Sequence, residues 1–451
     1  MKSRISSSLR LLPLFALLNL ASISNSYAQN PTGLQQAVKS DYQSYLAPLF
    51  DYFHRNPELS FVETKTAARL AQELRAAGFE VTEGVGKTGI VAILKNGPGP
   101  LVMMRADMDG LPVIEKSGLA NASTVMQKDK DGNLMPVMHA CGHDVHITSL
   151  IGTARRMSGL RQQWSGTLML IGQPAEEVVA GARAMMADHL WTRFGQPDYA
   201  ITFHVNAAVE AGKIDAVEGS PWSGVDTVDI LIHGQGAHGA SPHRGKDPIV
   251  LGAQIVIALQ TIISRERAPR DPAVITVGSF HSGTKSNIIS DQAKLQLTVR
   301  SESAQTREML LAAISRVALN TARAAGIPEN QLPEISMIGD PAPPTLNNIA
   351  LTQRLKKVWT EKIGSAIFDT HYQRMDMGAE DFAQFTTTPY IPSVYYSVGG
   401  TPKAAFDAEK AGGNPVPSHH SPLFKISAEP AIVTGVETAV IALLDLLKKN
   451  P

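Results

Sequence analysis

The densest group of metal-binding side chains in the sequence lies at residues 138–146. This run, MHACGHDVH, contains three histidines, one aspartate and the only cysteine of the chain, Cys141. Thiolate and imidazole are the preferred ligands of zinc-like divalent ions. A single buried histidine is usually structural, but a cluster around a lone cysteine predicts a metal site. Cys141 and His143 are the candidate ligands, and Asp144 and His146 are candidates for orienting them.

Two carboxylates, Asp107 and Asp109, directly follow an apolar run at residues 101–104. The run does not alternate, which predicts a strand buried on both faces. Ligands and catalytic groups of open α/β sheets collect at the carboxyl ends of strands. The two acids could bind metal or hold a metal-bound histidine, and the alternative is an ordinary pair of loop acids. Their position after a buried strand favours a functional role.

A second pair of carboxylates, Glu176 and Glu177, follows the strand predicted at residues 167–171. Adjacent carboxylates repel each other and stay ionised together only when they share positive charge, which a metal supplies. One could bind the metal while the other acts as general base on a water. The alternative is a solvated pair that opens a helix and is stabilised by the helix dipole. This motif alone leaves both possibilities open.

Two further histidines occupy comparable positions. His204 lies near the end of the strand predicted at residues 199–205, and His420 lies in the segment HHSP near the C-terminus. Each is weak evidence by itself. All of these side chains, however, lie at strand ends or in loops of one predicted core, and this shared placement favours a single site.

The elements that must position these residues alternate between strands and helices, which predicts an α/β core with a mostly parallel sheet flanked by helices. Predicted strands cover residues 90–94, 101–104, 167–171, 199–205 and 393–398. Predicted helices cover residues 66–77, 145–157, 181–189, 348–362, 379–385 and 428–449.

The pattern changes near residue 212 to the order β-α-β-β-α-β, which resembles a ferredoxin-like α+β unit. Its predicted strands cover residues 225–232, 273–280, 293–299 and 334–338, and its helices cover 248–263 and 306–325. We therefore predict a catalytic domain at residues 29–216 and 339–451, interrupted by an inserted domain at 217–338. The length of 451 residues also favours more than one domain.

Two segments, residues 84–89 and 234–239, match the pattern G-x-G-x-x-G. A dinucleotide-binding fingerprint follows a strand and opens a helix. The first segment precedes a predicted strand and the second opens no helix. Both are therefore predicted to be turns.

The first 28 residues have the pattern of a secretory signal. Basic residues precede an apolar run at residues 11–20, and small residues at Ser26 and Ala28 predict cleavage after Ala28. The apolar run is too short to span a bilayer, and we expect no later run to be long enough. The prediction is export to a periplasm or the exterior without a membrane anchor.

The composition argues against a nucleic-acid partner and excludes a disulfide within the chain. The 41 basic and 41 acidic residues balance, which gives no electrostatic case for binding nucleic acid. Exported proteins often carry disulfides, but a lone cysteine cannot form one within the chain.

The motifs RADMDGLP, MHACGHDVH, QPAEE, HV and HSP, in this order, closely resemble those of dinuclear-metal amidohydrolases related to aminoacylase and glutamate carboxypeptidase. Within that family the chain looks like the branch of hippurate hydrolase, indole-acetyl-amino-acid hydrolase and N-acyl-amino-acid deacetylases. The resemblance covers nearly the whole mature chain. It implies hydrolysis of the amide bond of N-acyl amino acids. A dipeptidase or carboxypeptidase is the alternative, and a non-catalytic binding relative is a remote one.

The resemblance also implies roles for individual residues. Glu176 corresponds to the catalytic acid/base, and Asp109 to an acid that orients a ligand. The expected ligands of two divalent ions are Cys141, His143, Glu177, His204 and His420. A cysteine ligand suits zinc, whereas manganese, cobalt or nickel can serve in this branch.

The inserted domain corresponds to the lid of the family, which commonly forms a homodimer. His238 matches a lid histidine that reaches a substrate oxygen, in its own chain or in its neighbour's. Asn287 and Arg300 are candidates for holding the α-carboxylate of a small-molecule substrate, and the guanidinium fork of arginine suits that task. For Arg300, an ordinary charge at a strand end is an equal alternative.

Overall fold

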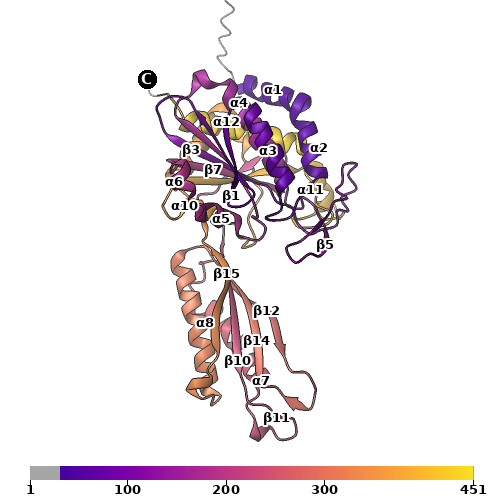
Figure 1. Cartoon of the computed structure of the whole chain (residues 1–451), viewed down its shortest axis with the longest axis vertical. Coiled ribbons are helices and arrows are strands. Elements are labelled where there is room, and N and C mark those ends of the chain that lie inside the picture. Colours follow the sequence, from indigo (N-terminus) through magenta and orange to yellow (C-terminus); the bar gives the residue numbers. More distant parts are fainter. Residues whose placement is uncertain (1–30, 450–451) are drawn as a thin grey trace, which may run out of the picture.

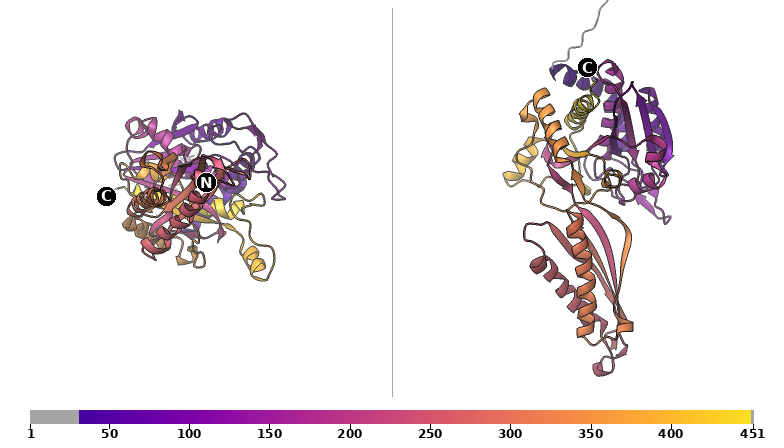
Figure 2. Two further views of the ribbon diagram at one scale, coloured as in Figure 1. Left: turned by 90° about the horizontal axis from the view of Figure 1, so that it is seen from below. Right: turned by 90° about the vertical axis from the view of Figure 1, so that its left-hand side faces the viewer.

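The computed structural model describes residues 31–449, and the predicted signal at residues 1–28 lies outside this range. The described chain forms a broad α/β unit and a narrow unit that projects from it (Figure 1). The right-hand view of Figure 2 shows the same elongated outline from the side. The functional motifs lie in the broad unit, and the segment predicted as the lid forms the narrow one.

The broad unit is built on a seven-stranded sheet with the order β1-β2-β6-β3-β7-β17-β8. Its four inner strands, β6, β3, β7 and β17, pair in parallel, and the outer pairings are antiparallel. Their bounds are β1 Glu80–Val85, β2 Gly89–Lys95, β3 Leu101–Asp107, β6 Thr167–Gln173, β7 Tyr199–Glu210, β8 Ile214–Asp215 and β17 Ser393–Thr401. The expected α/β core is therefore confirmed, with parallel strands at its centre.

Helices cover both faces of this sheet, because successive side chains of the inner strands point to opposite sides. Met104 packs into the larger core with the helices of one face, and its neighbour Met103 packs into the core of the other face. The helices of the first face are α1 Pro31–Asp41, α2 Ala47–Arg55, α3 Thr64–Ala76, α4 His143–Gly159, α9 Ile349–Lys362 and α12 Ala428–Leu446. Those of the second face are α5 Gly181–Ala187, α6 Leu190–Phe194 and α10 Ala383–Thr386.

The narrow unit is a four-stranded antiparallel sheet with the order β12-β14-β10-β15, covered on one face by two helices. This is the ferredoxin-like arrangement expected from the sequence. The elements are β10 Gly224–His233, α7 Pro248–Thr261, β12 Ala273–Ser282, β14 Gln292–Ser301, α8 Ala304–Ala324 and β15 Glu334–Ala342. The exact domain boundaries at residues 217 and 338 stay a prediction.

Several local features differ from expectation. Helices α1, α2 and α11 (Lys403–Lys410) and strand β1 were not predicted, and the helix predicted at residues 379–385 forms only as α10. The glycine-rich segment 84–89 connects β1 and β2 as a turn, as predicted.

The expectation about membrane-spanning length is also corrected. The helical segment Pro248–Glu266 is long and apolar enough to cross a bilayer by length and composition alone. It packs Leu251, Ile255 and Leu259 against the second sheet, so it is weak evidence of a membrane span.

Candidate metal centre

The predicted ligands meet at the carboxyl edge of the parallel strands, where a glycine turn places the first two. Gly142 has φ 84°, in the left-handed region, directly before α4. A Cβ atom at this position would lie 2.4 Å from Val205 Cγ1, so only glycine fits. The turn places Cys141 before the helix and His143 at its first residue. Both side chains thereby point to the same place.

The hydrogen bonds of His143 and His204 leave one ring nitrogen of each free for a metal. Nδ1 of His143 donates to the Asp109 carbonyl at 2.8 Å, and its buried Nε2 has no hydrogen-bond partner among the described residues. Nδ1 of His204 donates to the Val205 carbonyl at 2.7 Å, and its Nε2 lies 3.4 Å from Cys141 Sγ. In each ring the Nε2 lone pair therefore faces the site.

Glu177 and His420 complete the predicted ligand set. Glu177 Oε1 is buried without a hydrogen-bond partner in the described chain, and Oε2 lies 3.4 Å from His420 Nε2. Ligand atoms of Cys141, His143 and Glu177 lie within 4.8 Å of one another. Unpartnered buried polar atoms are costly, and a divalent cation would supply the missing partner. The residues therefore fit a metal centre.

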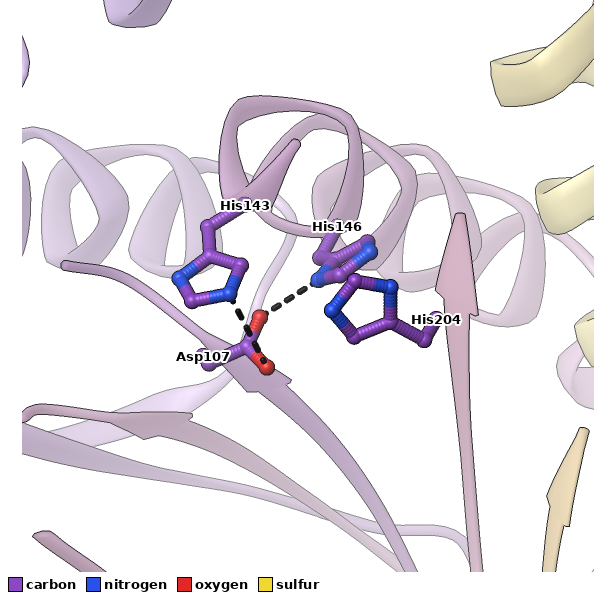
Figure 3. A group of neighbouring side chains, drawn as sticks. All are labelled: Asp107, His143, His146 and His204. Carbon is purple, nitrogen blue, oxygen red and sulfur yellow. Dashed lines mark hydrogen bonds and ion pairs between the residues drawn. The ribbon is translucent and has the colours of Figure 1, made fainter. Parts of the chain in front are cut away.

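His146 lies in the same cluster but is not free to bind a metal. Figure 3 shows Asp107 between His143 and His146. Nδ1 of His146 bonds Asp107 Oδ1 at 2.5 Å, and Nε2 accepts a hydrogen bond from the Val205 amide at 2.8 Å. Both ring nitrogens are thus occupied. His146 holds Asp107 and the end of β7 in place.

A buried arginine, Arg105, stabilises the acids below the site. It donates to Asp107 at 2.7 Å, to Gln173 at 2.8 Å and to Glu380 at 2.8 Å. Burial alone would raise the pKa of Asp107, but Arg105 and the neighbouring histidines hold it well below its usual range. Asp107 is therefore ionised. Sequence reasoning assigned no role to Arg105 or Glu380, which are 275 positions apart.

Glu176 is buried beside the ligands, with Oε2 3.9 Å from His143 Nε2. Desolvation and the nearby carboxylates Glu380 and Glu177 raise its pKa well above the usual value. A raised pKa makes this carboxylate a stronger base than an ordinary glutamate, which suits a group that accepts a proton and later returns it. The geometry can therefore provide a proton acceptor next to a metal-activated water.

The side chain of Asp109 orients the glutamates rather than the histidine. It accepts hydrogen bonds from the amides of Glu176 at 3.1 Å and Glu177 at 3.0 Å, and from the Ser60 hydroxyl at 2.6 Å. His143 is held by the backbone carbonyl of Asp109 instead, and the carboxylate lies 3.4 Å from its Nδ1.

His419 is a functional candidate that sequence reasoning did not identify. Its Nε2 accepts a hydrogen bond from the Ala207 amide at 3.1 Å, which leaves the proton on Nδ1, 3.8 Å from Cys141 Sγ. Desolvation lowers the pKa of His419 to about 3, so the ring stays neutral. It can donate to Cys141 Sγ. The sequence motif HSP assigned the ligand role to His420 and gave its neighbour His419 none.

A cavity of about 1100 Å³ extends from the metal centre to the base of the narrow unit. It is lined by Cys141, Glu176 and His420, and also by Arg300 from β14. Arg300 donates through Nε to Thr298 Oγ1 at 3.1 Å and has no carboxylate partner among the described residues. The free part of its guanidinium is available to an anionic group in the cavity.

The other two lid candidates come together, but outside this cavity. His238 lies in β11 (Ala237–His238), which pairs with β13 (Ile288–Ile289) next to Asn287. The Gly239 amide donates to the Asn287 carbonyl at 2.8 Å. Both residues are exposed, and β11 lies at the far tip of the narrow unit (Figure 1).

Residues 103–411 match the peptidase family M20/M25/M40. The chain is 35% identical over 347 residues to hippurate hydrolase of Campylobacter jejuni, covering 76% of this chain and 86% of that protein. It is 35% identical over 373 residues to thermostable carboxypeptidase 2 of Saccharolobus solfataricus, covering 81% and 89%. It is 32% identical over 413 residues to an IAA-amino acid hydrolase of Arabidopsis thaliana, covering 90% and 87%.

Solved structures show the same architecture over nearly the whole chain. A dinuclear metal-binding peptidase of the M20 family from Bacillus subtilis superposes with a TM-score of 0.73 at 27% identity, covering 92% of this chain and 100% of that chain. A protein from methicillin-resistant Staphylococcus aureus described as an aminohydrolase gives a TM-score of 0.79 at 29% identity, covering 92% and 99%.

Proposed function

Because the chain belongs to the M20/M25/M40 peptidase family, a family of amide-bond hydrolases, we propose that it cleaves N-acyl amino acids into a carboxylic acid and a free amino acid. One observation carries this proposal: Glu176, Arg300 and four of the five candidate ligands line one cavity, and the fifth ligand, His143, lies with its Nε2 3.8 Å from Glu177. The similarity to a hippurate hydrolase and to an IAA-amino acid hydrolase supports the substrate class.

The chemistry divides between the metals and the side chains. When bound, two divalent ions would polarise the amide carbonyl and lower the pKa of the attacking water. Glu176 accepts the proton of that water as its oxygen adds to the carbonyl carbon. Glu176 then donates this proton to the leaving nitrogen as the carbon–nitrogen bond breaks. Zinc suits the Cys141 ligand, and manganese, cobalt and nickel are the alternatives.

Arg300 is proposed to hold the α-carboxylate of the substrate. Its guanidinium offers a fork of donors that matches a carboxylate, and it faces the cavity from β14. A substrate bound in this way would span the gap between the metal centre and the narrow unit. Its amide bond would then lie within reach of Glu176.

His238 and Asn287 are proposed to act in the cavity of a second chain. Both lie at the tip of the narrow unit and neither lines the cavity of their own chain. A dimer formed through the narrow units can bring the tip of one chain to the metal centre of the other. His238 would then donate a hydrogen bond to the developing oxyanion.

The narrow unit has a surface suited to such a dimer. The outer face of α7 exposes Ile249, Val250 and Ile257 by 42%, 54% and 71%, and β12 beside it is an edge strand. Exposed apolar faces and unpaired edges of this kind mark interfaces. We expect Ile257→Lys to convert a dimer to monomers in light scattering, and Met337→Lys on the opposite edge strand to leave the dimer intact. A monomeric wild-type protein would refute the dimer.

A panel of substrates tests the proposed function. The enzyme should hydrolyse hippurate or N-acetyl amino acids faster than dipeptides when zinc, manganese, cobalt or nickel is supplied. The similarity to a carboxypeptidase supports the second candidate, a dipeptidase or carboxypeptidase. Faster cleavage of dipeptides would establish that candidate instead. Turnover of none of these compounds by a chain loaded with about two metals would refute both.

We also propose that residues 1–28 direct export and are removed. The support is the sequence pattern alone: basic residues, an apolar run and small residues before the cleavage point. N-terminal sequencing of the protein from its native host should begin at Gln29. A mature protein that retains Met1 would refute export by this route.

A further inference from the structure

Glu176 and Glu177 lie in a loop, residues 174–180, whose backbone is held in an unfavourable conformation. Ala175 has φ 50° and Val179 has φ 56°, in the left-handed region that residues with side chains rarely adopt. A Cβ atom at Gly181 would lie 1.5 Å from the Pro174 carbonyl oxygen, so the loop closes tightly on itself. A conformation of this kind persists only when its surroundings impose it.

Two buried carboxylates bind the backbone of this loop. Asp109 accepts the amides of Glu176 and Glu177, at 3.1 and 3.0 Å. Glu63, which is fully buried, accepts the amide of Ala175 through Oε1 at 2.8 Å. Three consecutive amides are therefore held by carboxyl oxygens, and these hydrogen bonds fix the path of the backbone through the loop.

The side chain of Glu63 does not cap the helix at whose start it lies. Glu63 is the N-cap residue of α3, yet its side chain makes no capping hydrogen bond. Glu58 accepts from the Thr66 amide of that helix instead, at 2.8 Å. The Oε1 atom of Glu63 accepts a second hydrogen bond, from the Phe61 amide at 2.9 Å. The carboxylate is thus directed at the loop of the catalytic glutamates.

Thr88 fixes the other oxygen of this carboxylate. Its hydroxyl donates to Glu63 Oε2 at 2.5 Å. Thr88 lies in the glycine-rich turn 84–89, which is packed directly against the same loop. A Cβ atom at Gly89 would lie 3.0 Å from Pro174 Cδ in this loop, and one at Gly86 would lie 2.5 Å from the Met185 nitrogen in α5, the helix that follows the loop. Gly86 and Gly89 therefore allow this turn to pack closely against the loop and α5.

We propose that Glu63, oriented by Thr88, is a positioning residue that holds Glu176 and Glu177 at the metal centre. The inference rests on the proposed roles of these two glutamates. Loss of the Glu63 carboxylate frees the Ala175 amide and lets the backbone leave the left-handed region. The carboxylates of Glu176 and Glu177 then move away from His143 and its neighbours.

The test compares Glu63→Ala with Glu63→Gln in zinc affinity and in hydrolysis of the best substrate of the panel. Glu63→Gln keeps Oε1 for the two amides, and its new amide group can donate to the Thr88 hydroxyl. We expect Glu63→Ala to lose about tenfold or more in zinc affinity and about a hundredfold in kcat. Glu63→Gln should stay within about threefold of wild type in both.

Matched variants separate positioning from general stability. Glu58→Ala removes a buried carboxylate from the same helix start, so it should lower Tm while zinc affinity and kcat remain unchanged. Thr88→Val should weaken zinc binding about fivefold through loss of one hydrogen bond, and Thr88→Ser should not. If Glu63→Ala does not fold, the comparison of Thr88→Val with Thr88→Ser tests the positioning role of Glu63.

Three results would overturn the proposal. The first is wild-type zinc affinity and kcat in Glu63→Ala, and the second is equal impairment of Glu63→Gln and Glu63→Ala. The third is equal zinc affinity in Thr88→Val and Thr88→Ser. Glu177→Ala distinguishes this failure from failure of the proposed function. If Glu177→Ala keeps its metals, the assignment of Glu177 as a ligand is wrong. If Glu177→Ala loses its metals while Glu63→Ala behaves as wild type, only the proposed role of Glu63 is refuted.

Discussion

Replacing Arg105 with methionine should destabilise the protein strongly, because it leaves buried carboxylates without the cation they share. Arg105 is 1% exposed, and its guanidinium lies 2.7 Å from Asp107, 2.8 Å from Glu380 and 3.6 Å from Asp381. Methionine fills much of the same space and carries no charge. The variant therefore tests the ion pairs rather than the packing.

The expected loss follows from the burial of the pairs. Removing one partner of a buried ion pair costs about 3–5 kcal/mol, a large share of the roughly 5–15 kcal/mol that stabilises a typical fold. The pKa of Asp107 is held well below its usual range by Arg105 and the neighbouring histidines. A depressed pKa contributes stability that is present above the unfolded pKa of about 4 and is lost as pH falls through the folded value. The deficit of Arg105→Met should therefore be largest near neutral pH and shrink below about pH 4.

Urea unfolding between neutral and acid pH, with a chelator present, measures this loss without a contribution from metal binding. Arg193→Met is the control, because Arg193 pairs with Asp188 at 2.5 Å on the surface, where solvent screens an ion pair and it contributes little to stability. A deficit for Arg105→Met below about 1 kcal/mol at neutral pH, or one that grows as the pH falls, would refute the reasoning.

Three further predictions concern other parts of the site. Burial opposes protonation of His54, but its hydrogen bonds to Asp144 and Glu115 raise its pKa to about 10. The stability that protonated His54 adds is therefore complete below about pH 6.5 and is lost as the pH rises toward 10. His54→Gln should abolish this pH dependence of the unfolding free energy, and an unchanged dependence would contradict the prediction. Cys141 should react slowly with a thiol reagent in the metal-loaded enzyme and faster after chelation, whereas equal rates would exclude it as a ligand; Cys141→Ser should weaken metal affinity. His238→Ala should bind metal normally and turn over about a hundredfold more slowly, and wild-type turnover would exclude the role of His238. Mixing this variant with Glu176→Gln should restore activity in hybrid dimers. No recovery on mixing would exclude action of His238 in the partner chain.

Much of the fold could be predicted because its signals are local. The inner strands are continuous apolar runs buried on both faces, and the narrow unit shows its β-α-β-β-α-β order directly in the sequence. The short α10 was predicted too long, because its neighbours Glu380 and Asp381 bond Arg105, Gln173 and Ala182 instead of extending a helix. Contacts with distant segments decided that boundary.

The candidate ligands could be named because motifs of a few residues contain them, but their surroundings could not. That His146 is unavailable to a metal depends on the Val205 amide, which lies 59 positions away. The bond between Glu63 and the Ala175 amide joins residues 112 positions apart. The spacing of residues along the sequence does not predict these hydrogen bonds, because they form only when the folded sheet brings its strand ends together.

The central claim is that Glu176 acts as the proton acceptor beside a metal centre that it does not itself hold. The most direct measurement is the metal content and kcat of Glu176→Gln, which keeps the shape of the side chain and removes the acceptor. We predict that this variant binds metal as the wild type does, about two ions per chain, and loses about 10²-fold to 10⁴-fold or more in kcat. Near-normal kcat, or loss of the metals together with activity, would contradict the account.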